Sequence, residues 1–310
     1  MAKRRGRPLD GWIALDKPDD LTSAQAVARV RKALDADKAG HAGTLDPLAT
    51  GVLPIALGEA TKTMAFAQDS RKVYDFTVRW GIATTTDDRE GTESGTSPVR
   101  PPAAAIAAAL PAFTGQIMQV PPDYSAIKVG GQRAYDLARD QQPVHLTARP
   151  VIVEAFEMIE FIDTETARFR VACGKGTYVR ALVRDLARAL GTLGHITALR
   201  RTQCGVFTES SAIPLEKLEA LGHSAPASAY LLPIRTVLDD IPALALTPEE
   251  AQRLRHGQAV ALFPVAQRNP QVALTQGVPV QALLADELVA IAEVGPGMLK
   301  PVRVIASPRT

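Results

Sequence analysis

The sequence predicts an α+β fold in which a mixed, mostly antiparallel sheet forms the main domain and a small β-rich domain follows. Strand-like segments with alternating apolar residues, such as 73–80, are not separated by regular crossover helices, and this argues against a parallel sheet. A few amphipathic helices stand between the strands, of which 178–190 is the clearest. After Pro233 the chain changes to short apolar segments separated by glycine and proline.

The N-terminal segment predicts a strand, a helix and a loop, in that order. Residues 12–15 form a short apolar run that ends at the turn of Lys17 and Pro18. A helix is expected from about Ser23, because apolar residues then recur at helical spacing and Thr22 or Ser23 can cap its free amides. Residues 40–54 contain three glycines, two prolines and two threonines, which predicts a loop with short apolar pieces.

The middle of the chain predicts the strands of the main sheet. Residues 73–80 alternate cleanly, so that one face of the expected strand carries Tyr74, Phe76, Val78 and Trp80. The other elements expected here are a polar turn region at 84–98, a helix at 103–110, an exposed loop or arm at 121–142, and strands at 151–161 and 167–173.

The helix expected at 178–190 carries an apolar stripe on one side and Arg180, Arg184 and Arg188 on another, at i, i+4 and i+8. It lies in a basic stretch, 165–205, where eight lysines and arginines stand against two acidic residues. A phosphate-facing surface explains this excess, and so does a solvated basic face. The formal net charge of the whole chain, +2, is too small to decide between them.

The small C-terminal domain is expected to begin with a helix at 248–256. Short strands should follow it, centred on Val260, Val272, Leu288 and Val302.

Composition excludes several classes of protein. Two cysteines, Cys173 and Cys204, do not form a disulfide framework and fit a reduced cytosol. The five histidines are scattered and form no metal-ligand motif. The basic start of the chain lacks the apolar stretch of a signal peptide, and the most apolar run, 103–110, is too short to span a membrane. We therefore expect a cytoplasmic protein without a membrane span.

The most informative single residue is Asp46. It precedes Pro47, which biases its backbone to an extended conformation, and Gly43 and Gly51 permit a close approach of a ligand or another chain segment. An aspartate held in such a loop can be a catalytic carboxylate. It can equally form an Asx turn or a helix cap, and the residue types alone favour that second interpretation.

Seven blocks of sequence, in a fixed order, change this balance. They are GWIALDKP (11–18), GHAGTLDPLATGVLPIALGEATK (40–62), KVYDFTVRWG (72–81), TTTDDREG (84–91), PPDYSAIKVGGQRAYDLAR (121–139), GKGTYVRALVRDLA (174–187) and LRRTQCGVF (199–207). Together they resemble the motifs of the TruB family of pseudouridine synthases over roughly residues 10–240.

The resemblance implies a bacterial-type enzyme that isomerises uridine 55 in the T loop of tRNA. Such an enzyme breaks the N-glycosidic bond, turns the uracil and rejoins it through carbon, so it needs no cofactor and no metal. This agrees with the absence of phosphate-loop and dinucleotide motifs in the sequence. By its place in the motif, Asp46 is the catalytic carboxylate. Whether it attacks the anomeric carbon or removes a sugar proton stays open.

The same motifs assign two partners to Asp46. Tyr74 is expected to stack on the flipped uracil and to take part in proton transfer at the ring carbon, although its shared face with Phe76 is typical of a core residue. Arg180 is expected to grip Asp46 with two hydrogen bonds, and a plain surface arginine is the alternative. We assign Arg188 to the surface.

Seven further residues are expected to bind the substrate. Tyr178 and Leu199 match positions beside the base, and Leu199 is also compatible with the core. His41 matches a residue that enters the T loop, and Asp88 either lies near the substrate or forms a turn. The expected phosphate contacts are Lys17, Lys128 and Arg184, with Lys62 as a further candidate.

The resemblance also implies how the chain is divided into domains and that its binding partner is tRNA. Residues 1–10 form a basic tail, 11–240 the catalytic domain, 121–150 an arm that clamps the T stem-loop, and 245–310 a PUA-like domain. We expect a monomer that acts on tRNA without an obligate protein partner. The alternatives are a subunit of a guide-RNA particle and a module that folds or binds tRNA.

Overall fold

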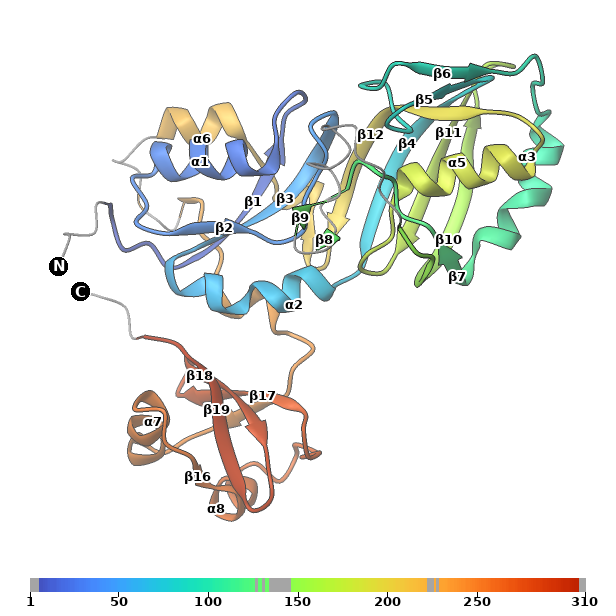
Figure 1. The fold of residues 1–310 in the computed structure, drawn as a ribbon. Coiled ribbons are helices and arrows are strands. Elements are labelled where there is room, and N and C mark those ends of the chain that lie inside the picture. Colours follow the sequence, from blue (N-terminus) through green and yellow to red (C-terminus); the bar gives the residue numbers. More distant parts are fainter. Residues whose placement is uncertain are drawn as a thin grey trace.

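The computed structural model describes residues 6–125, 128–129, 132–133, 146–221, 226 and 229–306. Within these residues, ten strands form one large sheet in the order β14-β1-β3-β12-β4-β11-β10-β7, with β2 on β3 and β13 on β12 (Figure 1). Their bounds are β1 Gly11–Lys17, β2 Ala39–His41, β3 Ala49–Leu57, β4 Lys72–Trp80, β7 Gly115–Gln119, β10 Arg149–Phe161, β11 Thr166–Cys173, β12 Gly194–Cys204, β13 Phe207–Thr208 and β14 Ile213–Pro214.

The sheet is mixed and mostly antiparallel, as the sequence predicts. Among the described strands of this sheet, only the pairs β1–β14 and β12–β3 run parallel. Two smaller hairpins accompany it, formed by β5 Ile82–Thr84 with β6 Glu93–Thr96 and by β8 Lys128–Val129 with β9 Gln132–Arg133. The α+β class is therefore confirmed.

Short helices cover the sheet. One half carries α1 Ser23–Ala33 and α6 Leu215–Leu221, which pack together, and the other carries α5 Val179–Ala189 and α3 Ala103–Ala109 (Figure 1). Helix α1 begins as expected, because the side chain of Thr22 accepts a hydrogen bond from the amide of Gln25 in a capping box. Helix α2 Met64–Asp69 joins β3 to β4 through the short 3-10 helix η1 Gly58–Thr63.

The expected loop at 40–54 is wrong at both ends, because β2 ends at His41 and β3 begins at Ala49. Only 42–48 connects them. Strand β3 is buried along nearly its whole length between β1 and β12. Gly51 serves this packing rather than a turn: its φ is +97°, and a Cβ there would lie 2.3 Å from the carbonyl oxygen of Arg201. Long-range pairing thus overrides the local turn composition.

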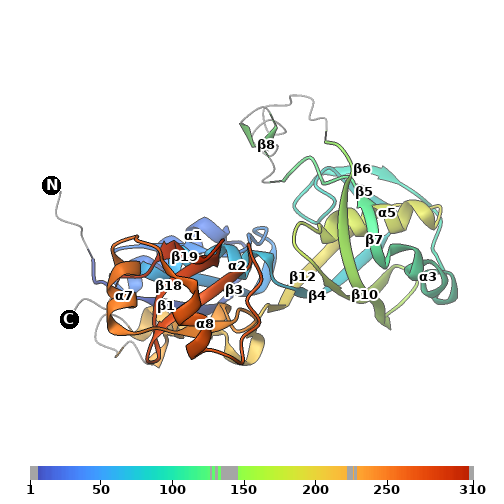
Figure 2. The same ribbon diagram turned by 90° about the horizontal axis from the view of Figure 1, so that it is seen from below.

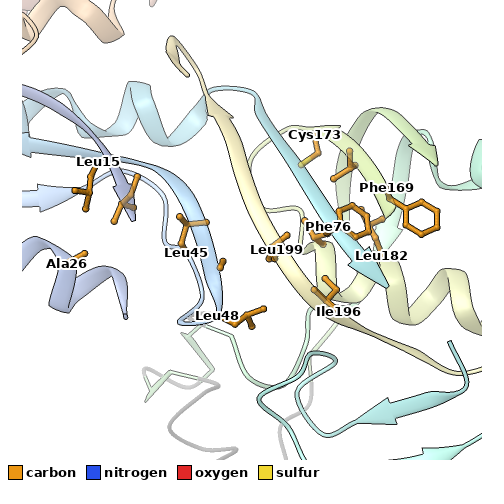
Figure 3. Packing of buried hydrophobic residues seen from close by; sticks show 14 of the residues in the cluster. Leu15, Ala26, Leu45, Leu48, Phe76, Phe169, Cys173, Leu182, Ile196 and Leu199 are labelled. Atoms are coloured by element: carbon orange, nitrogen blue, oxygen red, sulfur yellow. The ribbon is translucent and has the colours of Figure 1, made fainter. Parts of the chain in front are cut away.

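The main core places the residues that line the centre of the sheet. Phe76 on β4 stacks on Phe169 at 5.6 Å between ring centroids, and Trp80 meets Phe169 edge-on at 6.1 Å. Such pairs add about 0.5–1.5 kcal/mol each to the free energy of burial. Leu45 and Leu199 belong to the same core, and Figure 3 shows them on facing segments. Aromatic packing therefore holds β4 firmly in the middle of the molecule.

The C-terminal part forms its own sheet, in the order β15-β17-β18-β19-β16. Its elements are β15 Ala243–Ala245, α7 Pro248–Arg255, β16 Val260–Ala261, α8 Leu262–Arg268, β17 Pro279–Leu284, β18 Glu287–Val294 and β19 Met298–Val304. The strand expected around Val272 is wrong. That residue lies in a turn and packs against the small core as a single side chain, and the strand forms later, as β17.

The C-terminal sheet lies below α2 in Figure 1, and it overlaps β1 and β3 when the molecule is seen from below in Figure 2. A hydrophobic cluster of Leu238, Leu283, Leu288, Ile291 and Ile305, with Phe66 of α2 packed against it, fills the junction. Polar contacts reinforce it, because Lys62 Nζ donates to the carbonyl of Val304 at 2.7 Å. Lys62 therefore ties the two parts together rather than standing free for phosphate.

No helix among the described residues is long and apolar enough to cross a membrane.

Candidate active site

A cavity of about 240 Å³ opens where the 42–48 loop, β4, β12 and the start of α5 meet. It is lined by Gly43, Thr44, Leu45, Asp46, Gln68, Lys72, Tyr74, Gly174, Gly176, Thr177, Tyr178, Val179, Arg180, Leu199 and Arg201. The structure thus brings together Asp46, Tyr74, Arg180, Tyr178 and Leu199, which come from four separate sequence blocks. The roles assigned to them stay predictions.

Asp46 is presented to this cavity by a loop that the core holds from behind. Its neighbour Leu45 is buried, and the backbone of Leu45 makes reciprocal hydrogen bonds with the hydroxyl of Ser23 at the start of α1, at 2.8 and 2.9 Å. On the other side, the carbonyl of Pro47 accepts a hydrogen bond from Lys17 Nζ at 3.0 Å. The carboxylate itself remains about one-third exposed, so a substrate can reach it.

Arg180 contacts Asp46, but not as a two-pronged grip. Its Nε lies 2.9 Å from Asp46 Oδ2. Its two terminal nitrogens donate instead to the backbone carbonyls of Thr86 and Tyr124, each at 2.9 Å. The expected bidentate pairing is therefore wrong, because two other chain segments use those donors. The buried guanidinium is fixed by the fold and offers one edge to the carboxylate.

Asp88 lies behind Arg180 rather than on the cavity wall. Its side chain is almost fully buried and its Oδ2 is 3.5 Å from Arg180 Nε. It accepts hydrogen bonds from the hydroxyl of Thr86 and from the amide of Glu90. Burial raises the pKa of the Asp88 carboxyl above its usual range. Of the two expected positions, the structure shows the turn, with Arg180 placed between two carboxylates.

Tyr74 is both a cavity residue and a core residue. It is half-buried on β4, packs against the main core and lines the cavity. Burial raises the pKa of its hydroxyl to about 12. The phenol therefore keeps its proton at neutral pH and can donate or relay it. The guanidinium of Arg201 lies 5.9 Å from the centre of the ring.

Tyr178 and Leu199 also line the cavity. Tyr178 caps the start of α5, and its backbone exchanges two hydrogen bonds with the side chain of Gln119, at 2.8 and 3.1 Å. The guanidinium of Arg149 lies 5.4 Å from the centre of the Tyr178 ring. Leu199 is 6% exposed on β12, so it belongs to the core and to the cavity at once.

Two of the expected phosphate contacts, Lys17 and Arg184, are largely buried and already paired within the chain. Lys17 is fully buried, and its ammonium donates to the carbonyls of Pro18, Leu21 and Pro47 at 2.6–3.0 Å, so it is not a free phosphate ligand. Burial lowers the pKa of Lys17 to about 8. Arg184 lies within 3.4 Å of carboxylate oxygens of both Asp185 and Asp87 and is mostly buried, which argues against a phosphate role. In both cases the positive charge serves the fold.

Three other residues named in the sequence analysis, His41, Lys128 and Arg188, are not among the described residues that line the cavity. His41 is half-buried at the end of β2, and its pKa is lowered by burial and, to a smaller extent, by the charge of Arg201. Lys128 belongs to β8, but its side chain lies outside the described residues, as do 126–127, 130–131 and 134–145 of the expected arm. Arg188 is 68% exposed, as its surface assignment requires.

Sequence reasoning missed several residues that hold the site. Ser23, Lys72, Gln119 and Arg201 are all buried, and each makes hydrogen bonds to backbone groups. Most of these contacts join residues that are far apart in the sequence, so no local spacing could reveal them. Polar residues inside apolar strands are the one available signal, since buried polar groups need partners.

The geometry limits the chemistry. One carboxylate faces a space bordered by a tyrosine ring and an apolar wall, with a guanidinium in contact. This arrangement suits a nucleobase stacked on the ring while the carboxylate reaches its sugar.

Comparison with known proteins identifies the family. A model of the TruB family pseudouridylate synthase N-terminal domain matches residues 31–179, and one of the tRNA pseudouridylate synthase B C-terminal domain matches 180–239. The tRNA pseudouridine synthase B of Caulobacter vibrioides is 55% identical over 98% of this chain and 99% of its own length. That of Rhodospirillum rubrum is 53% identical over 98% of both. The chain belongs to the TruB family and is a pseudouridine synthase, an isomerase.

Solved structures agree in fold. The chain is similar to one in the crystal structure of a Cbf5-Nop10-Gar1 complex, with a TM-score of 0.74 and 26% identity over 96% of this chain and 85% of that one. A chain in the structure of an H/ACA RNP bound to a substrate RNA has the same TM-score at 24% identity, over 100% of this chain and 92% of that one.

Proposed function

We propose that this enzyme converts uridine 55 in the T loop of tRNA to pseudouridine, as a monomer in the cytoplasm and without a guide RNA. The observation that carries the proposal is the contact of Asp46 with Arg180, at 2.9 Å, on the wall of a cavity that Tyr74 and Leu199 also line. Relatives named tRNA pseudouridine synthase B that match nearly the whole chain at more than half identity support tRNA as the substrate.

In the proposed reaction the target uridine leaves its stack and enters the cavity between Tyr74 and Leu199. The cost of unstacking, a few kcal/mol, is offset by stacking on the tyrosine ring. Asp46 then faces the sugar, and Arg180 holds both the direction and the charge of its carboxylate. Attack on the anomeric carbon and removal of a sugar proton both fit this position of the carboxylate.

The decisive experiment uses the purified protein and an unmodified tRNA transcript. Pseudouridine is mapped by chemical labelling after incubation, and the expected result is a single modified position in the T loop. A transcript with uridine 55 replaced by cytidine serves as the control. A protein that modifies RNA only when a guide RNA and partner proteins are added would instead be the catalytic subunit of a guide-RNA particle.

We expect turnover to persist in EDTA without any added nucleotide. The reaction moves no phosphoryl group and no electron, and the proposed chemistry uses only side chains of the chain itself. The measurement is conversion of a pre-folded transcript in EDTA, with the fold of the RNA checked under the same conditions. Loss of turnover on a folded transcript would reveal a metal requirement and contradict the proposed mechanism.

Replacing Lys175 with alanine should weaken tRNA binding and make it less sensitive to salt. Lys175 follows Gly174 at the rim of the cavity and is 65% exposed; its ion pair with Asp69, at 2.9 Å, is of the weak surface kind that a phosphate can displace. Loss of one phosphate contact lowers the log–log salt slope by about 0.7–0.9.

The matched control for Lys175→Ala is Lys217→Ala, since Lys217 is exposed on α6, a helix that contributes no residue to the lining of the cavity. Filter binding over a salt series measures both variants. An unchanged slope for Lys175→Ala would remove this rim from the RNA interface.

A further inference from the structure

Among the described residues that line the cavity, Arg201 is the most deeply buried cation. It lies on β12 between Gly51 of β3, its partner on one side, and Tyr74 of β4, its partner on the other. Its side chain is among the largest of the fully buried ones, and the residue is 1% exposed. Burial of a guanidinium is costly unless its donors are satisfied, so its contacts indicate what the charge is for.

Those contacts are with the loop that carries Asp46 and with strand β3, which follows it. Nη2 donates to the carbonyl of Gly43 at 3.0 Å, before Asp46 in the chain, and Nε donates to the carbonyl of Val52 at 2.7 Å, after it. Nη1 makes longer contacts, at 3.5 Å, with the carbonyl of Thr44 and the hydroxyl of Tyr74. One side chain therefore joins the start of the 42–48 loop to strand β3, which follows the loop, and contacts the hydroxyl of Tyr74.

The loop backbone passes close to this guanidinium at Gly43. Gly43 has a φ of +87°, and a Cβ on it would lie 3.5 Å from Arg201 Nη1, so the loop backbone turns closely over the guanidinium. A guanidinium donates from three nitrogens held in one rigid plane, whereas an ammonium donates from a single atom, so a lysine would not present donors at the same separate positions. Among the described residues, no carboxylate forms an ion pair with Arg201, so its charge is directed at carbonyl groups and at Tyr74.

We propose that Arg201 is a positioning residue for catalysis: its guanidinium ties Gly43 to Val52 and thereby sets the direction in which Asp46 faces Tyr74 across the cavity. It does this from within the core and does not bind RNA phosphate. The proposal rests on the proposed function, because its kinetic test uses pseudouridine formation in tRNA. It assigns a role to the second arginine of the LRRTQCGVF block.

Two variants test it, Arg201→Lys, which keeps the charge but loses the fork, and Arg201→Met, which loses both. Arg200 supplies matched controls, because the neighbouring Arg200 points outward and pairs with Asp16 and Glu209. Each variant is measured for melting temperature, tRNA affinity, single-turnover rate at saturating enzyme, and hydrogen exchange of the 42–48 backbone amides.

Both Arg201 variants should keep tRNA affinity within about threefold of the parent, since Arg201 is only 1% exposed. Their single-turnover rates should fall by about 100-fold, the scale of a misplaced catalytic group, and the 42–48 amides should exchange faster. The Arg200 controls should change neither quantity by more than about threefold. Recovery of the rate by Arg201→Lys would show that charge alone matters and would overturn the proposal.

Other results also overturn it. They are a folded Arg201 variant that turns over as fast as the parent, a loss confined to affinity, and failure of both variants to fold, which would assign Arg201 to stability alone. A parent protein that is inactive on tRNA would reject the proposed function instead, and hydrogen exchange would still report on the loop.

Discussion

Replacing Asp46 with asparagine should lower the turnover rate by about four to six orders of magnitude, the loss seen when a catalytic nucleophile is removed from other enzymes. Asparagine keeps the shape of the side chain and removes its charge, so the cavity and the contact with Arg180 retain their outline. Affinity for tRNA should stay near that of the parent, because the carboxylate does not bind phosphate. Single-turnover conversion and filter binding measure the two quantities separately.

The control for Asp46→Asn is Asp75→Asn. Asp75 lies on β4 next to Tyr74 but pairs with Arg170 and takes no part in the cavity. It should turn over normally. Near-normal activity of Asp46→Asn would remove Asp46 as the catalytic carboxylate, and a protein whose cellular role survived this change intact would act mainly by binding or folding tRNA.

Replacing Tyr74 with phenylalanine should lower turnover by roughly two to four orders of magnitude if the hydroxyl carries a proton, the range for general acid–base catalysis. The pKa of this hydroxyl is raised to about 12, so Tyr74 is protonated at neutral pH and can donate its proton during the reaction. The ring that stacks on uracil remains in Tyr74→Phe, so binding should hold. Tyr74→Leu removes the ring as well and should also weaken binding, by about 1–3 kcal/mol.

Tyr230 provides the control for a tyrosine that serves only the core. It is 4% exposed, and its hydroxyl has no hydrogen-bond partner among the described residues. Tyr230→Phe should therefore leave turnover unchanged, since even a real hydrogen bond is worth only about 0.5–1.5 kcal/mol. If Tyr74→Phe behaves like Tyr230→Phe, Tyr74 is a stacking platform without a role in proton transfer.

Local patterns in the sequence predict much of the fold. Alternation located the strand of Tyr74, and Thr22 marked the start of α1 with its own hydrogen bond. The same reasoning failed at 49–54, where glycine and proline stand inside a buried strand, and at Val272, where an apolar residue stands in a turn. Strand pairing and burial decide these cases, and neither is visible in a short window of sequence.

The site divides along a similar line. Asp46 and Arg180 lie in different blocks, so their contact could be expected only from a family resemblance, and the structure then changed its form from two hydrogen bonds to one edge contact. Lys17 and Arg184 are expected phosphate contacts because they are cationic. In the structure, however, the ammonium of Lys17 donates to backbone carbonyls and the guanidinium of Arg184 pairs with carboxylates of the same chain. Sequence shows that a charge exists but not which way it faces.

The seating of the C-terminal sheet has a consequence for the shape of any RNA that touches it. Phe66, the Leu238 cluster and the Lys62 hydrogen bond join that sheet to α2 and η1. Gln281 fastens the connecting segment as well, by donating to the carbonyls of Leu238 and Ile241. These contacts fix the distance from the cavity to the C-terminal sheet. An RNA that reaches both must match that span, whatever its base sequence.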